Sequence, residues 1–554
     1  MSLTALFDIG KTGVLTYQRA LEVVSHNIAN ASTEGYSRQD VIFQNMPSTT
    51  ASIVGISGRG VKIVDIRRMY DSFIELQLKT ESSNLAYWDV VYNGMLRLEH
   101  IFNEASDIAL SNSINDFFNA WQELSQNPSG TAERALLIDK ANYLAERLNL
   151  SYKSLIDERQ EIYNDTRNLV DQINKYINQI NELNEKIAAA PGSLDAKDQR
   201  ENIVKRLNEI VQITYFEDNA GRYSILLGGM PLVDGGRVYH LNVGLDMNQN
   251  MRFTIETVSG TIDVTNLIHG GKLKAEIDLR DSTIPQYMNK LNMLVFDLTE
   301  AINAQHRKGY GLDGSTGNNF FTQLYDLNIL SPPISPYSDI IFKINNINAN
   351  TYDKYQIQFD GTAVPPTWTV TYKTTSSSVE NLEINSWSDA TDRYYKLKFN
   401  DIEITIKNPD NNLNFTFQIK QHSALLFNVT VTDIQKIAAA KTNPTGPNSG
   451  VMDNENARAI YSLINSRIIG NATPIDFYRE IVAEVGVYSL RAKTQKSFQQ
   501  ALVEEMEKRR QSLSGVSLDE EAVNLIKYQK MYEASARLIR VANEILTTLF
   551  DMVR

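Results

Sequence analysis

Both ends of this 554-residue chain carry apolar residues at spacings that alternate between four and three. This heptad pattern predicts helices that bury one stripe of side chains against a partner helix. The N-terminal seam, as we call the first stripe, comprises Leu3, Phe7, Gly10, Val14, Tyr17, Leu21, Val24 and Ile28. The C-terminal seam follows Gly515 and comprises Leu518, Ala522, Leu525, Gln529, Tyr532, Ala536, Ile539, Asn543, Leu546, Phe550 and Val553. A second stripe beside it comprises Tyr528, Met531, Ser535, Leu538, Ala542, Ile545, Leu549 and Met552.

The N-terminal helix cannot be stable by itself. Ordering about 26 residues costs roughly 1 to 2 kcal/mol each, whereas eight buried seam side chains return about 2 kcal/mol apiece. We therefore predict that Leu3, Phe7, Val14, Tyr17, Leu21, Val24 and Ile28 pair with Leu518, Leu525, Tyr532, Ile539, Leu546 and Phe550. Gln529 and Asn543 are polar members of the C-terminal seam, and such positions set register or oligomeric state. In the free monomer we expect both ends to be disordered.

The interior of the chain changes from helical to β patterns and back. A third seam runs from Leu137 to Ile187 and ends at Pro191 and Gly192, which predicts roughly 75 Å of helix. Its expected packing partner is a helical run with Ile481, Val485, Tyr488, Ala492, Leu502 and Met506 on one face. Residues 209 to 270 and 330 to 436 have the alternating pattern and turn residues of β domains, with a short helical stretch, LNMLVFDLTEAINAQH, between them.

These patterns predict a multidomain α+β protein. Its terminal heptad helices and a long helical-bundle rod are formed by both chain ends, and two mainly-β domains are inserted. The predicted domains are residues 1–45 with 516–554 as terminal coiled-coil assembly segments, 46–208 with 441–515 as an elongated helical rod, 209–329 as a mixed, mainly β domain, and 330–440 as an outer β domain.

The composition argues against several classes of function. A net charge of −12 disfavours binding to nucleic acid or to an anionic membrane, because both need clustered Lys and Arg. The chain has no run of eighteen apolar residues, so we predict no membrane-spanning helix. Charged residues among the first twenty disfavour a cleaved secretory signal. The chain has no cysteine, which removes disulfides and thiol ligands, and its six histidines lie far apart. We expect neither a metal nor a cofactor.

One glycine motif is a candidate cofactor site. Gly309, Gly311 and Gly314 in GYGLDG satisfy the spacing GxGxxG. A dinucleotide fingerprint needs a strand before it and a helix after it. Here a helical pattern precedes the glycines and the polar run STGNNF follows. We therefore interpret the motif as a flexible glycine loop and predict no enzymatic activity.

The segment that follows the N-terminal seam reads VVSHNIANASTEGYSR, residues 23 to 38. It is compatible with an ordinary helix C-terminus, with Asn30 near the cap and Gly35 supplying a positive φ. That interpretation leaves Asn27, beside the seam, and Tyr36, just past the glycine, without a role. We expect the asparagines to be satisfied by neighbours that are absent from the monomer.

The two ends of the chain resemble a known family. VSHNIANASTEGYSR is similar to the N-terminal motif of the bacterial flagellar axial proteins, and SGVSLDEEAVNLIKYQKMYEASARLIRVANEILTTLFDMVR to their C-terminal motif. Three internal stretches, INDFFNAWQELSQNPSGTAERALLI, AKDQRENIVKRLNEIVQITYFEDNAGRYSILLGGMPLV and AINAQHRKGYGLDG, resemble the flagellar hook-associated protein 1 family. The resemblance covers about residues 1 to 325 and 450 to 554, and residues 330–440 match nothing that we recognise.

The resemblance implies a structural, non-enzymatic subunit of the hook–filament junction. Such a subunit is exported unfolded through the flagellar type III apparatus with an export chaperone. It assembles with itself in a ring, between hook protein on one side and a second junction protein on the other, outside the cell. In this interpretation the paired seams build an inner tube wall, and Asn27, Asn30, Gly35 and Tyr36 shape the turn that leads out of it.

Three alternatives stay open at this stage. The chain could be hook protein itself or another axial subunit, or a coiled-coil adhesin that forms parallel homo-oligomers. It could also be an exported enzyme or glycan-binding protein on an axial scaffold. In that last case Trp368, Trp387, Tyr394 and Tyr395 would stack on sugars, although aromatic residues more often pack a β core.

Overall fold

The computed structural model describes residues 3–46, 59–102, 109–257, 260–331, 340–344, 354–372, 378–379, 381–389, 392–399, 402–409, 413–421, 424–445 and 451–553. The chain divides into two compact units. Unit 1 comprises Met1–Leu96, Gln160–Thr283 and Tyr488–Arg554, and unit 2 comprises Arg97–Arg159 and Ile284–Val487. This division is coarser than the four domains expected from the sequence, which stay a prediction.

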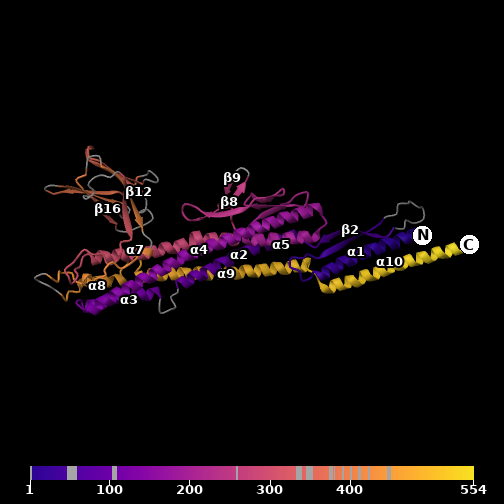
Figure 1. The fold of residues 1–554 in the computed structure, drawn as a ribbon, viewed down its shortest axis with the longest axis horizontal. Helices are drawn as coiled ribbons and strands as arrows, with labels where there is room; N and C mark the ends of the chain where they lie inside the picture. Colours follow the sequence, from indigo (N-terminus) through magenta and orange to yellow (C-terminus); the bar gives the residue numbers. More distant parts are fainter. Residues whose placement is uncertain are drawn as a thin grey trace. The chain divides into compact units, whose positions relative to one another are not determined.

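Helices, several of them long, account for about half of the chain (Figure 1). They are α1 Leu3–Ala29, α2 Ser72–Ile101, α3 Leu110–Gln126, α4 Thr131–Ala189, α5 Leu194–Ile210, α6 Gly271–Asp278, α7 Ile284–His306, α8 Glu455–Ser462, α9 Pro474–Ser514 and α10 Leu518–Val553. The helices predicted from the three seams, from the run around Ile481 and from LNMLVFDLTEAINAQH are therefore confirmed.

Helix α4 illustrates why these segments are helical. Its 59 residues contain neither glycine nor proline, and most of its seam side chains, such as Leu137, Leu155 and Ile173, are buried. Because most helical stability comes from such tertiary burial, the continuous seam keeps the helix unbroken. It ends at Ala189, directly before Ala190, Pro191 and Gly192, as the two helix-breaking residues predict.

The β strands of unit 1 form three antiparallel sheets. An antiparallel pair joins β1 Gln39–Asn45 and β2 Val61–Arg68. The strands β3 Thr214–Glu217, β4 Tyr223–Leu227, β5 Met230–Asp234 and β6 Arg237–Val238 follow one another in one sheet, and β7 Leu241–Leu245, β8 Met251–Thr257 and β9 Gly260–Asp263 in another.

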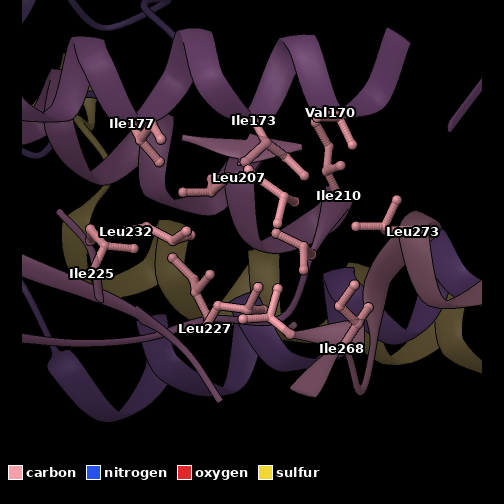
Figure 2. Packing of buried hydrophobic residues seen from close by; sticks show 14 of the residues in the cluster. Val170, Ile173, Ile177, Leu207, Ile210, Ile225, Leu227, Leu232, Ile268 and Leu273 are labelled. Carbon is pink, nitrogen blue, oxygen red and sulfur yellow. The ribbon is translucent and has the colours of Figure 1, made fainter. Parts of the chain in front are cut away.

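Figure 2 shows how Ile173 and Ile177 of α4 pack with Leu207 of α5, Ile225 of β4 and Leu273 of α6. This cluster, the main core of unit 1, contains no residue of α1 or α10.

Unit 2 contains two four-stranded antiparallel sheets that face each other. One has the order β10 Tyr325–Ser331, β17 Asn414–Gln421, β12 Lys354–Asp360 and β13 Thr367–Tyr372, and the other β11 Ile340–Ile344, β16 Ile402–Lys407, β15 Arg393–Phe399 and β14 Glu383–Ser388. The ring centroids of Tyr355 and Phe399, one from each sheet, lie 5.3 Å apart. The predicted second β region is thus a sandwich.

The GYGLDG loop follows α7 and is attached to residues 435–440. The amide of Tyr310 donates to the Ala440 carbonyl at 2.8 Å, and that of Leu312 to the Gln435 carbonyl at 2.7 Å. A Cβ on Gly311 would lie 2.5 Å from the Gln435 oxygen, and Gly314 has a φ of +80°. The glycines therefore permit close backbone packing. The loop is held at two points rather than free, which corrects the expectation of a flexible loop.

The fold class expected from the sequence, a multidomain α+β protein with long terminal helices, is confirmed. Within the described ranges, no helix combines the length and apolar character that crossing a membrane requires.

Candidate assembly site at the paired chain ends

The two terminal helices lie side by side and run antiparallel in unit 1 (Figure 1). At one end of the pair, Asn27 of α1 meets Glu521 of α10. Towards the other end, a Cβ on Gly10 would contact Ile539 at 2.6 Å, and one on Gly13 would contact the Ser535 hydroxyl at 2.4 Å. The absence of side chains at both glycines is what allows the two helices to approach so closely.

A neighbouring side of α1 packs on the β1–β2 pair. The hydroxyl of Thr16 donates to the carbonyl of Val61 at 2.9 Å, and Ala20, Val23 and Val41 form a small buried cluster. Tyr528 of α10 packs against the same cluster. Its ring also stacks on Tyr17 of α1, with 6.4 Å between centroids. Helix α1 is therefore enclosed by α10 and by a β hairpin whose role the sequence did not suggest.

Asn27 makes four hydrogen bonds within the chain. Its Nδ2 donates to the Gln39 carbonyl at 2.9 Å and to Oε2 of Glu521 at 3.1 Å. Its Oδ1 accepts from the Gln39 amide at 2.9 Å and from the Tyr36 hydroxyl at 2.7 Å. We call Asn27, Tyr36, Gln39 and Glu521 the Asn27 network. Because an amide side chain offers two donors and two acceptor lone pairs, Asn27 is fully satisfied, and the expectation that it waits for an absent neighbour was wrong.

Asn30 is satisfied locally as well. Its Nδ2 donates to the His26 carbonyl at 3.0 Å, and its Oδ1 accepts from the Thr33 hydroxyl at 3.2 Å. Gly35 follows with a φ of +79°, a conformation that glycine adopts without strain. These contacts end α1 and turn the chain so that Tyr36 points back to Asn27.

Burial raises the pKa of the Tyr36 phenol, and the carboxylates of Asp195, Asp198 and Glu521 raise it further. The phenol therefore keeps its proton and donates a hydrogen bond to Oδ1 of Asn27. The Nδ1 of His26 lies 3.0 Å from the same hydroxyl.

Charged side chains hold the chain beyond the turn. The guanidinium of Arg38 contacts Glu520 at 2.7 Å and Glu521 at 2.8 Å, and its backbone amide donates to the Ser514 carbonyl at 2.9 Å. The Ser37 amide donates to Asp198 of α5 at 3.1 Å. The turn thereby joins α1, α5, the end of α9 and the start of α10.

A hollow of about 860 Å³ opens beside this turn. Its lining carries both signs of charge, with Arg38, Lys205 and Arg510 among Glu75, Glu201 and Glu507. Several of these are already paired, such as Lys205 with Glu507 at 2.6 Å and Arg510 with Glu75 at 2.7 Å. Over the described parts of the chain, no three histidine or carboxylate side chains gather closely enough to hold a metal ion.

The sequence-predicted residues fall into two groups. The first group is buried or partly buried. Val24 and Asn27 are buried, and the partly buried residues are Leu3, Phe7, Val14, Tyr17, Leu21, Ile28, Asn30, Gly35, Tyr36, Leu525, Ile539 and Leu546. Leu518, Gln529, Tyr532, Asn543 and Phe550 are exposed. The predicted pairing of Leu518, Tyr532 and Phe550 with the N-terminal seam does not occur within this chain. Gln529 and Asn543 are exposed, and that they set register or oligomeric state in contacts with other chains stays a prediction.

The reason is a rotation of both helices from the predicted seams. The side of α1 that is buried most deeply carries Gly10, Gly13, Ala20, Val24 and Asn27. The buried positions of α10 are Glu521, Ser535 and Ala542. Ser535 and Ala542 belong to the second stripe, so α10 faces α1 with that stripe and not with the C-terminal seam.

The sequence also missed the partners of the turn. Glu521, Arg38, Asp195 and Asp198 were not singled out, although they contact it. A signal for Glu521 was available in SLDEE, where Ser517 directly precedes α10 and acidic residues fill the first helical turn. Glu521 also lies seven residues before Tyr528, in line with the second stripe, whereas Glu520 does not, and this spacing was a further signal.

The outer face of α10 is apolar and uncovered in this chain. Its exposed large side chains are Leu518, Val523, Ile526, Met531, Tyr532, Leu538, Val541, Ile545, Leu549, Phe550 and Met552. The side chain of Phe550, for example, is 68% exposed. So many exposed large apolar side chains on one helix mark a site of protein–protein contact.

The four aromatic residues proposed for sugar stacking separate in the structure. Trp368 and Tyr395 pack in the sandwich, with ring centroids 5.4 Å apart. Trp387 is exposed and stacks on Tyr394 of the neighbouring strand, with 5.3 Å between centroids and 5° between the ring planes. The core interpretation therefore holds for the first pair.

Three family models match the chain. The model described as "Flagellar hook-associated protein FlgK helical domain" covers residues 95–321. "Flagella basal body rod protein" matches residues 8–36, and "Flagellar basal body rod FlgEFG protein C-terminal" matches residues 509–552. The last two coincide with α1 and its turn and with α10.

Curated relatives align along the whole chain. Flagellar hook-associated protein 1 of Salmonella typhimurium is 30% identical over 99% of this chain and 100% of that protein. The protein of the same name from Escherichia coli is 28% identical over 99% and 100%. The aligned span includes most of residues 330–440, where the sequence alone suggested no resemblance.

A solved structure shares the fold. The flagellar hook junction protein FlgK from Burkholderia pseudomallei superposes with a TM-score of 0.59 at 19% identity, covering 79% of this chain and 100% of that one.

Proposed function

Because the chain belongs to the flagellar hook-associated protein 1 family, we propose that it is a non-enzymatic subunit of a ring that joins the flagellar hook to the filament. The ring would consist of copies of this chain. Hook protein would contact it on one side and a second junction protein on the other.

The exposed apolar face of α10 is the observation that carries this proposal. Helix α1 and the β1–β2 pair cover one side of α10, and large apolar side chains elsewhere on α10 are exposed to solvent. Such a face is costly for an isolated molecule and is stabilised when other helices cover it. Neighbouring subunits of an assembled ring would supply those helices.

In this proposal the turn residues have a structural role. Asn27, Asn30, Gly35 and Tyr36 end α1 and direct the chain into β1 through contacts that are complete before assembly. The terminal pair would form the inner wall of the ring. The absence of cysteine suits export of an unfolded chain through the type III apparatus with a chaperone, followed by folding outside the cell.

The proposal is tested by removing residues 520–554 in a strain that lacks its own copy of this protein. We expect the purified truncated chain to keep the main core of unit 1, because α10 contributes no residue to that cluster. We expect electron micrographs to show hooks without filaments. Collapse of the whole fold would make α10 ordinary core and contradict the proposal.

A matched pair of point variants sharpens the test. Leu538→Glu places a charge on the exposed apolar face, and Arg537→Glu changes the charge at the neighbouring exposed position. Both free chains should fold, and only Leu538→Glu should leave hooks bare. Normal filaments on cells with Leu538→Glu would show that this face is not an assembly surface.

The rival interpretations carry less. Against hook protein itself, the curated relatives of this chain bear the name flagellar hook-associated protein 1. A parallel coiled-coil adhesin would pair α10 with a second α10, whereas here α10 pairs with α1 of its own chain in the antiparallel sense.

A further inference from the structure

The contact between α1 and α10 repeats every seven residues. Along α10, Glu521, Tyr528, Ser535 and Ala542 are seven apart, and all four lie on the side that faces the rest of unit 1. Along α1 the matching series is Asn27, Ala20, Gly13 and Leu6. Asn27 contacts Glu521, and Gly13 lies against Ser535. A heptad contact has a general weakness, since sliding one helix by seven residues, about 10 Å, brings similar side chains together again.

Glu521 differs from every other member of these series because it is charged and 1% exposed. Its two carboxylate oxygens have separate partners. Oε1 lies 2.8 Å from Nε of Arg38, and Oε2 accepts from Asn27 at 3.1 Å. Both partners are available only when α10 stands at one axial position.

We propose that Glu521 and Asn27 together determine the axial register of α10 against α1. This inference rests on the proposed function, in which that pair is the assembly element of the subunit. A ring of such pairs needs one register in every copy, because the exposed face of α10 moves with the helix. Asn27 and Glu521 are positioning residues, since they act through the helices they align.

A shift by one heptad shows why the polar pair discriminates. If Ser535 moved from Gly13 to Leu6, Glu521 would move from Asn27 to Ala20. Ala20 belongs to the buried apolar cluster with Val23 and Val41. A carboxylate there would have neither Arg38 nor Asn27, and an unpaired buried charge is strongly unfavourable. Tyr528 would at the same time be pressed against Gly13, where the helices approach most closely.

The absence of cysteine allows the register to be read directly by disulfide trapping in the full-length chain. Three reporter chains share Ser535→Cys and add Leu6→Cys, Gly13→Cys or Ala20→Cys. A Cβ on Gly13 lies 3.0 Å from that of Ser535, so the second reporter detects the register seen here. The other two detect a shift by one heptad in either direction, because a disulfide does not form between Cα atoms more than about 7 Å apart.

The variants are compared in all three reporters. We expect the otherwise unchanged chain and Glu520→Ala to be trapped only through Gly13→Cys. Glu520 is the matched control, since it also pairs with Arg38, at 2.7 Å, but is exposed. In Glu521→Ala we expect the rate of trapping through Leu6→Cys to rise at least tenfold. Glu521→Gln, whose amide oxygen can still accept from Asn27, should restore trapping through Gly13→Cys.

Two results would overturn the proposal. One is trapping of Glu521→Ala through Gly13→Cys alone, at the rate of Glu520→Ala. The other is equal loss of all three disulfides in Glu521→Ala and Glu521→Gln, which would make the residue a contributor to stability and not to register. The measurement uses the free chain, so either result leaves the assembly proposal to be judged by the filament test above.

Discussion

At the scale of single residues, His306 connects α7 to two other segments of unit 2. Its Nδ1 donates to the Asn318 carbonyl, 2.7 Å away, and its Nε2 accepts from the Ala438 amide at 3.0 Å. The ring is fully buried at the end of α7 and packs edge-on to Trp121. This geometry requires the neutral imidazole, because the protonated ring could not accept from Ala438.

Protonation of His306 should therefore destabilise the fold. Burial lowers the pKa of His306 to about 4, whereas an unfolded histidine titrates near 6.5. The unfolded chain binds the proton first, so this residue's contribution to the free energy of unfolding is complete above about pH 6.5 and is lost as the pH falls towards 4. Urea unfolding across this range, compared with His306→Gln, measures it. His306→Gln should lose about 1 to 3 kcal/mol at pH 7.5 and show a weaker pH dependence than the parent.

Asp297, on the same helix, should have the opposite effect. Burial, together with the nearby carboxylate of Glu300, raises the pKa of its carboxyl to about 7. Between about pH 4 and 7 the folded chain holds a proton that the unfolded chain has lost, so this contribution to stability grows as the pH falls. We expect Asp297→Asn to raise the free energy of unfolding at pH 8 by about 1 to 3 kcal/mol and to have a much smaller effect at pH 4. An equal gain at both values would rule out the titration of Asp297 as the cause.

At the scale of elements, the pairing of α1 with α10 depends on the absence of side chains. A Cβ on Gly10 would lie 2.6 Å from Ile539 and 3.2 Å from the backbone oxygen of Ser535. Backbone cannot rotate away as a side chain can. The two helices must then separate to admit a larger residue.

Gly10→Val should weaken this pair. We expect a loss of about 1 to 3 kcal/mol, as for other overpacked contacts, even though valine is a better helix former than glycine. Hydrogen exchange along residues 518–553 should accelerate. Lys11→Val, at the adjacent exposed position, should leave the exchange unchanged. Equal protection in both variants would mean that the helices do not approach closely in solution.

At the scale of the whole molecule, the terminal pair stands apart from the cores. The main core of unit 1 is built from α4, α5, α6 and β strands, and α10 leaves many apolar side chains exposed. The two ends therefore have less buried surface to stabilise them than the rest of the chain. Low local burial is what permits local unfolding.

Limited proteolysis of the free chain should show this difference. We expect residues 1–35 and 520–554 to be cleaved first, leaving a resistant fragment that contains the core of unit 1. Mass spectrometry of the fragments identifies the cleavage sites. Protection of both ends at protease levels that cut the loops of the β sandwich would contradict the prediction, and would indicate that the pair is stable before assembly.

The sequence by itself determined the elements. Heptad spacing over long, glycine-free and proline-free runs predicted α4 and α10, and the Pro191–Gly192 break predicted where α4 ends, because these signals act within one segment. The alternating patterns likewise predicted the two β regions. Asn27 and Tyr36 could be singled out because polar and aromatic groups beside a seam need partners.

Only the tertiary structure decided which faces meet. The α1–α10 contact brings Gly10 against Ile539 and Gly13 against Ser535, since close approach is decided by the sum of two surfaces and not by either helix alone. Glu520 and Glu521 are adjacent and chemically identical, yet one is exposed and the other bonds Asn27 and Arg38. Spacing places Glu521 in line with the second stripe, but the partners that it bonds lie nearly five hundred positions away, and only the tertiary structure identifies them.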